Sequence, residues 1–216
     1  MRKHHYSGYT LIELSVALTL AGIVVLASVS GTAWLLDQQR INELSTQNAD
    51  AIKRLNDAYD QLPNYAGLSL RQAVSFGAFR RFVINQAGTP NVAVTHPFSG
   101  AVGVATLNGA PLTWGLYLNS IPARYCTDLL FQSDAMSDAL VVFPGGMVDP
   151  IGWAGAGGVT VDASVPAITI AAGFAGTAPR IVKNLTQNNL VPAALAAACN
   201  GAGDNIGVLL LKSKLR

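Results

Sequence analysis

One apolar run near the amino terminus constrains this chain more than any other feature. From Tyr9 to Leu36 there are 28 residues, and Glu13 is the only charged residue among them. About 20 consecutive apolar residues suffice for a helix to cross a bilayer. The preceding residues, Met1-Arg2-Lys3-His4-His5, are basic, which predicts that this end stays in the cytoplasm. An ordinary secretory signal has a shorter apolar run that precedes its cleavage site, whereas this run follows the small residue Gly8.

Glu13 is the unusual residue of this run. A carboxylate in hydrocarbon costs about 2.5–3.5 kcal/mol on insertion scales, so a partner is expected for it. If the peptide bond after Gly8 were cut, Tyr9 would carry a new α-ammonium group one helical turn from Glu13. That geometry indicates an assembly device rather than an ordinary membrane anchor.

The run Gly8-Tyr9-Thr10-Leu11-Ile12-Glu13-Leu14-Ser15-Val16-Ala17 resembles the amino-terminal signature of type IV prepilins and the related type II secretion pseudopilins. The resemblance implies cleavage between Gly8 and Tyr9 by a prepilin peptidase, N-methylation of Tyr9, and a helical filament whose register Glu13 sets. Two features depart from the usual pattern. Tyr9 stands where phenylalanine or methionine is more common, and there is no proline between Tyr9 and Leu62.

The sequence predicts four segments. Residues 1–8 are a basic leader, 9–36 a transmembrane and filament-core helix, 37–62 an amphipathic spine helix, and 63–216 a globular head. The spine has one apolar stripe among polar residues, and Pro63 provides a stop. The stripe consists of Ile41, Leu44, Ala51, Leu55, Ala58 and Leu62.

The head has short helical and β-branched segments. We expect helices over residues 69–84, 125–132 and 190–199. Strands are expected over residues 102–107, 112–118, 140–143, 167–171 and 206–211. A long amino-terminal helix followed by these elements predicts an α+β fold, in which the helix packs on a mainly antiparallel sheet.

Two cysteines, Cys126 and Cys199, lie in the head. The predicted orientation places them outside the cytoplasm, where disulfides form, so we expect a bridge that bounds residues 126–199. Two separate buried thiols are the alternative. A large disulfide-bounded region near the carboxyl end resembles type IVb pilins.

The sequence contains no convincing catalytic, cofactor or metal site. His96 is the only histidine after the leader, which argues against a multi-histidine metal site or a catalytic triad. The glycine-rich residues 152–158 lack the lysine and hydroxyl of a phosphate-binding loop, and we interpret them as a surface loop. The acids Asp128, Asp134, Asp138 and Asp149 form no recognisable pair. Without Arg2 and Lys3, 12 basic and 12 acidic residues remain, so nucleic-acid binding is not indicated.

The resemblance implies a non-enzymatic structural subunit, a major pilin of a pilus used for adhesion, motility, aggregation or conjugative contact. Its expected partners are copies of itself, the prepilin peptidase, an inner-membrane assembly platform, and membrane lipid before assembly. The head would lie in the periplasm first and on an extracellular pilus later. Two alternatives remain: a minor pilin or type II secretion pseudopilin, and a membrane-anchored binding module that never polymerises.

Overall fold

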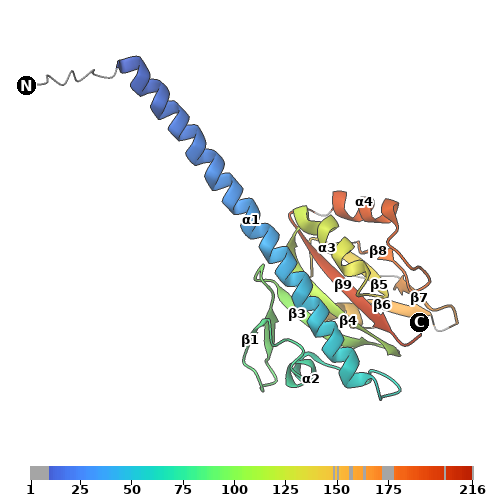
Figure 1. The fold of residues 1–216 in the computed structure, drawn as a ribbon. Helices are drawn as coiled ribbons and strands as arrows, with labels where there is room; N and C mark the ends of the chain where they lie inside the picture. The colour runs from blue at the N-terminus through green and yellow to red at the C-terminus, as the bar shows by residue number, and fades with distance from the viewer. Residues whose placement is uncertain are drawn as a thin grey trace, which may run out of the picture. The chain divides into compact units, whose positions relative to one another are not determined.

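The computed structural model describes residues 10–147, 149, 151–155, 158–162, 164–171, 178–201 and 203–215, with only the helical backbone at positions 29, 30 and 33. The leader and the predicted processing residues Gly8 and Tyr9 lie outside this part of the chain. Internal contacts divide the chain into two units, Met1–Arg40 and Ile41–Arg216. The first helix, α1 (Leu11–Tyr59, 49 residues), runs through the boundary between them (Figure 1).

The second unit contains a seven-stranded antiparallel sheet with the order β1-β2-β3-β4-β9-β5-β8. The last strand, β9, lies between β4 and β5 and pairs with both along most of its length. The strands of this sheet are β1 (Val83–Asn85), β2 (Ala93–Thr95), β3 (Ala101–Leu107), β4 (Ala110–Pro122), β5 (Ala139–Pro144), β8 (Arg180–Lys183) and β9 (Asn205–Ser213). Two further strands, β6 (Val159–Asp162) and β7 (Ala167–Ile170), pair only with each other.

Helices cover one face of the large sheet. Within the second unit, α1 lies over this face with α2 (Leu70–Ser75) and β1 to one side and α3 (Cys126–Asp134) to the other (Figure 1). Alternate residues of β9, from Ile206 through Val208 to Leu210, enter the same apolar core as Leu44 and Leu55 of α1. Successive side chains of a strand point to opposite faces of the sheet, so the other residues of β9 face away from α1.

The opposite face of the sheet has a second core. Leu209 and Leu211 of β9 pack there with Phe143 and Trp153. Trp153 lies in the short 3-10 turn η2 (Gly152–Ala154) and is fully buried. Gly115 of β4 makes room for it, because a Cβ at this position would lie 2.6 Å from Cη2 of the indole.

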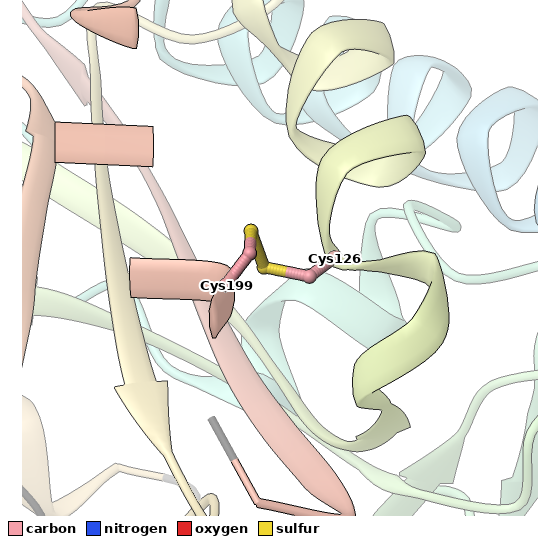
Figure 2. The surroundings of a disulfide bond; sticks show 2 residues. All are labelled: Cys126 and Cys199. Atoms are coloured by element: carbon pink, nitrogen blue, oxygen red, sulfur yellow. A yellow bond between two sulfur atoms is a disulfide. The ribbon is translucent and has the colours of Figure 1, made fainter. Parts of the chain in front are cut away.

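The predicted disulfide is present. Cys126, the first residue of α3, is bonded to Cys199 in the last turn of α4 (Pro192–Asn200) (Figure 2). The two Cα atoms are 5.7 Å apart, and 73 residues separate the cysteines in sequence. The bridge thus joins the two helices at the boundaries of the region 126–199.

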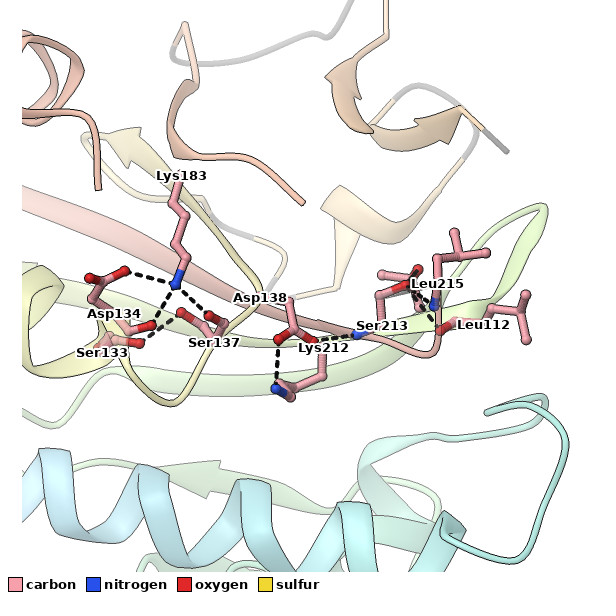
Figure 3. Close-up of polar contacts among 10 residues, drawn as sticks. Leu112, Ser133, Asp134, Ser137, Asp138, Lys183, Lys212, Ser213 and Leu215 are labelled. Carbon is pink, nitrogen blue, oxygen red and sulfur yellow. Dashed lines mark hydrogen bonds and ion pairs between the residues drawn. The ribbon is translucent and has the colours of Figure 1, made fainter. Parts of the chain in front are cut away.

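A buried lysine forms a second link in the same region. Nζ of Lys183, in edge strand β8, lies 2.8 Å from Oδ1 of Asp134 and donates hydrogen bonds to the carbonyl oxygens of Asp134 and Ser137 (Figure 3). Lys183 is only 3% exposed. The lysine therefore ties the end of α3 and the following turn to the edge of the sheet.

The α+β class is confirmed, and the five predicted strands are present with small changes in bounds, one of them as β7 of the small sheet. The helix predicted over residues 69–84 is wrong. Helix α2 ends at Ser75, Gly77 then has a φ of 70°, and residues 83–85 form β1. The predicted stripe of α1 needs a correction too. Ala58 and Leu62 are exposed, and Ile52 and Tyr59 are buried in their place.

Candidate assembly and anchoring site

The amino-terminal half of α1 is long enough and apolar enough to cross a membrane. The segment that meets these criteria of length and composition is Leu11–Ser28, and none of it is buried within the protein. Large apolar side chains of this segment are exposed on every side of the helix, among them Leu11 (88%), Leu18 (65%) and Leu26 (72%). A helix that is apolar all round must be covered by lipid or by other helices.

Hydroxyl groups in this segment are satisfied within the helix. Ser15 donates to the carbonyl oxygen of Ile12 and Ser28 to that of Val24, each at 2.8 Å. Thr19 donates in the same way to Ser15. Because each hydroxyl bonds to the preceding turn, these residues present little unsatisfied polarity to an apolar environment.

Glu13 has a specific local partner. Its Oε2 accepts hydrogen bonds from the backbone N–H of Thr10 (2.9 Å) and from the Thr10 hydroxyl (3.0 Å), and Thr10 Oγ1 accepts from the backbone N–H of Glu13 (3.3 Å). This reciprocal pair is a capping box, which satisfies backbone donors at the start of a helix. Sequence reasoning singled out Glu13 but missed Thr10, although Ser/Thr-x-x-Glu before an apolar run is a signal for this motif.

The capping box leaves part of the carboxylate open. Both Thr10 donors reach Oε2, and no described residue donates to Oε1. Glu13 is exposed in the single chain. Oε1 can therefore accept a hydrogen bond from a further donor while the helix start stays capped.

In the head, the candidate residues named from sequence serve the fold. Asp134 binds Lys183, and Asp138 accepts from Lys212 Nζ (2.8 Å) and from the backbone N–H of Ser213 (2.9 Å). Asp149 accepts from the backbone N–H of Ile151. Asp128 is exposed in the first turn of α3. Among the described residues no group of three His, Cys, Asp or Glu side chains is placed to hold a metal ion.

His96 is also structural. Its Nε2 lies 2.6 Å from the carbonyl oxygen of Asn119, and its Nδ1 accepts from the backbone N–H of Phe98 at 3.2 Å. Burial lowers the pKa of His96 below its ordinary value, with the Asn119 contact acting in the opposite direction. The neutral imidazole satisfies both contacts and closes the turn between β2 and β3.

Residues 3–29 match the family model described as the prokaryotic N-terminal methylation motif. No curated protein matches the chain. Among solved structures, the chain is similar to the type IVb pilin from Salmonella typhi, at 10% sequence identity and a TM-score of 0.47, covering 77% of this chain and 95% of that one. It is also similar to TcpA, a type IV pilin from the Vibrio cholerae El Tor biotype, at 17% identity and a TM-score of 0.48, covering 81% and 99%. The motif match includes Gly8, Tyr9 and Glu13, and it supports the resemblance of this segment, residues 3–29, to the amino-terminal signature of type IV prepilins.

Proposed function

We propose that this protein is a structural subunit of a type IV pilus. The observation that carries the proposal is the amino-terminal methylation motif on a helical segment, Leu11–Ser28, whose apolar side chains are exposed all round and whose single acid is Glu13. A folded head with a disulfide, in the second unit, is consistent with a subunit that works outside the cell.

In this proposal a prepilin peptidase cuts after Gly8 and methylates Tyr9. The Tyr9 ammonium then approaches Oε1 of Glu13, on a neighbouring subunit or on its own, while Glu13 Oε2 continues to accept from Thr10 and the capping box stays closed. In the dry centre of a helix bundle such a pair is strong, although desolvation offsets much of the gain. Its main effect is on register, because a mismatched stagger would leave a charge buried without a partner.

The subunit waits in the inner membrane with its head in the periplasm. As the assembly platform extracts it, the apolar side chains of Leu11–Ser28 exchange lipid for the helices of other subunits. The pilus then extends outside the cell and acts in adhesion, motility, aggregation or conjugative contact.

A series of three variants tests this function and separates the two roles of Glu13. Glu13→Gln keeps a side chain that can complete the capping box but removes the charge. Thr10→Ala removes the hydroxyl half of the box but keeps the charge, and Glu13→Ala removes the charge together with the carboxylate half of the box. Each is compared with wild type by mass spectrometry of the processed chain and by the amount of subunit in sheared surface filaments.

We expect all three variants to be processed. Glu13→Gln and Glu13→Ala are expected to be missing from filaments, whereas Thr10→Ala assembles. Filaments made equally well by Glu13→Gln would contradict the register role of the charge. Wild-type protein that keeps Met1, or that stays wholly in the membrane fraction, would contradict the pilus function and favour an anchored module or a pseudopilin.

A further inference from the structure

A cluster of arginines beside α1 has more positive charge than its own acids neutralise. Oδ2 of Asp50 lies 3.1 Å from Nε of Arg54, 3.4 Å from Nε of Arg80 and 3.8 Å from Nε of Arg81. Arg80 and Arg81 remain more than half exposed, whereas the Asp50 side chain is 19% exposed. The hydrogen bond from Arg54 is the main cause of a lowered pKa at Asp50, so its carboxylate is charged, and its Oδ2 is shared by the three arginines.

A groove next to this cluster contains a buried polar atom without a hydrogen-bond partner among the described residues. Arg81 lines a groove of about 450 Å³ together with Asn42, Glu43, Thr46 and Gln47 of α1. Gln47 is 4% exposed; its Nε2 donates to Glu43 Oε1 at 2.9 Å, and its Oε1 is buried with no hydrogen-bond partner among the described residues. The three arginines of the cluster therefore outnumber the two acids beside them, Asp50 and Glu43.

Val83 extends this surface. It begins β1, the strand at one edge of the sheet, and is 62% exposed. Arg80, Arg81 and Val83 together form what we call the basic flank of the head. It lies on the β1 side of α1 (Figure 1).

The opposite side of α1 has the complementary pattern. Asp128 and Phe131 lie three residues apart on α3 and so share one face of that helix. Asp128 is exposed and makes no ion pair with a described residue, and Phe131 is 59% exposed. The nearby Arg124 has its guanidinium over the Tyr125 ring, 4.7 Å from the centroid. Asp128 and Phe131 form the acidic flank.

We propose that the basic flank of one copy docks on the acidic flank of the next copy. Each flank combines unneutralised charge with one large exposed apolar side chain, and the two charges are opposite. Because the two surfaces differ, the contact is head-to-tail and leaves one free flank at each end, which allows it to repeat along a filament. This inference rests on the proposed function and names the surfaces through which the heads join.

A cysteine pair tests the contact directly. Val83→Cys and Phe131→Cys are introduced together in the full chain, and sheared filaments are oxidised and run on a non-reducing gel. The expected result is a ladder of covalent multimers, because every subunit links to the next one. The matched control is Val165→Cys with Phe131→Cys, since Val165 is similarly exposed (56%) but lies in the β6–β7 turn, and it should give no ladder.

A charge exchange provides a second measurement. Arg81→Glu and Asp128→Arg, each alone, are expected to lower the amount of subunit in sheared filaments about tenfold or more, because like charges then face each other. The two changes in one chain should restore filaments. Arg71→Glu, an exposed arginine of α2 outside both flanks, is the control and should assemble as wild type does.

The outcomes separate this inference from the function on which it rests. Filaments that form but give no ladder, or single charge variants that assemble normally, would overturn the docking of the two flanks and leave the pilus function intact. Failure of the wild-type chain to enter filaments would overturn the proposed function itself.

Discussion

His96 shows how a single side chain can make stability depend on pH. Its two ring nitrogens contact Asn119 and Phe98, and the contact with Phe98 needs an unprotonated Nδ1. Gly100 is part of this arrangement, since a Cβ there would lie 1.9 Å from the Asn119 oxygen and 2.3 Å from His96 Nε2. The turn therefore closes around a neutral imidazole.

We predict that the free energy of unfolding falls as the pH drops below about 6.5, the ordinary pKa of an unfolded histidine. Burial lowers the pKa of His96 in the folded state, so the unfolded chain binds the proton first and is favoured in acid. A His96→Gln variant should be less stable at pH 7.5 by about 1–2 kcal/mol and should lose little more between about pH 6.5 and 5. Urea denaturation of both proteins from pH 7.5 to 5 measures the difference in stability and its dependence on pH. Parallel curves for the two proteins would contradict this account.

Lys183 and Lys53 form ion pairs of the same length in different surroundings. Both lie 2.8 Å from an aspartate, but the side chains are 4% and 23% exposed for Lys183 and Asp134, and 73% and 64% exposed for Lys53 and Asp57. We predict that Lys183→Met lowers the free energy of unfolding by about 3–5 kcal/mol, because it leaves a buried carboxylate unpaired. The matched Lys53→Met should change it by less than about 0.5 kcal/mol. Equal effects in urea denaturation would show that burial does not decide the contribution of these pairs.

At the scale of elements, the disulfide fastens α3 to α4. Closing a loop of this length reduces the freedom of the unfolded chain and is worth about 4 kcal/mol in the chain-entropy model. We predict that Cys126→Ser with Cys199→Ser lowers the free energy of unfolding by about this amount and exposes residues 126–199 to proteolysis first.

The control for this prediction is the wild-type protein after reduction, which should match the double serine variant in stability. A loss below about 1 kcal/mol would mean that Lys183 and the strand pairing of β5 with β9 hold the region without the bridge.

The long elements and several short ones, such as β5, β7, α3 and α4, were predictable from the sequence, and other short ones were not. The apolar run and the stop at Pro63 predict α1 to within three residues of its observed end at Tyr59. The segment 69–84 has helical spacing of apolar residues, but Gly77 and the pairing of Val83 with Thr95 overrule this local preference. Strand β8 was not predicted because its four residues, Arg180–Lys183, include two charges, one of which is buried only through contacts distant in sequence.

Some residues of the candidate site were likewise predictable from the sequence, and others were not. Glu13 and the cysteines stand out by type and position, so the sequence indicates them directly. Thr10 matters through a reciprocal hydrogen bond, and its role is evident only once the helix is known to start at Leu11. The surplus of arginines around Asp50 involves two segments about 30 residues apart in sequence, and only the fold brings them together.

At the scale of the whole molecule, the described buried apolar side chains all belong to the second unit. Among the described side chains, the buried apolar residues begin at Ile41 and continue through α1 to Tyr59. We predict that a chain lacking residues 1–36 is monomeric and unfolds at the same urea concentration as the full chain in detergent. Removing residues 1–56 should prevent folding, because Leu44, Ala51 and Leu55 leave the core. A stable protein from the shorter chain would contradict this assignment of the core.

The central claim is that the chain is cut and modified before it assembles, and the most direct test is the mass of the amino-terminal peptide in filaments sheared from wild-type cells. The account predicts a peptide that begins at Tyr9 and carries one methyl group on its α-amine, as the major species. A peptide that still contains Met1 and the leader, or the complete lack of this chain from the sheared material, would contradict the account.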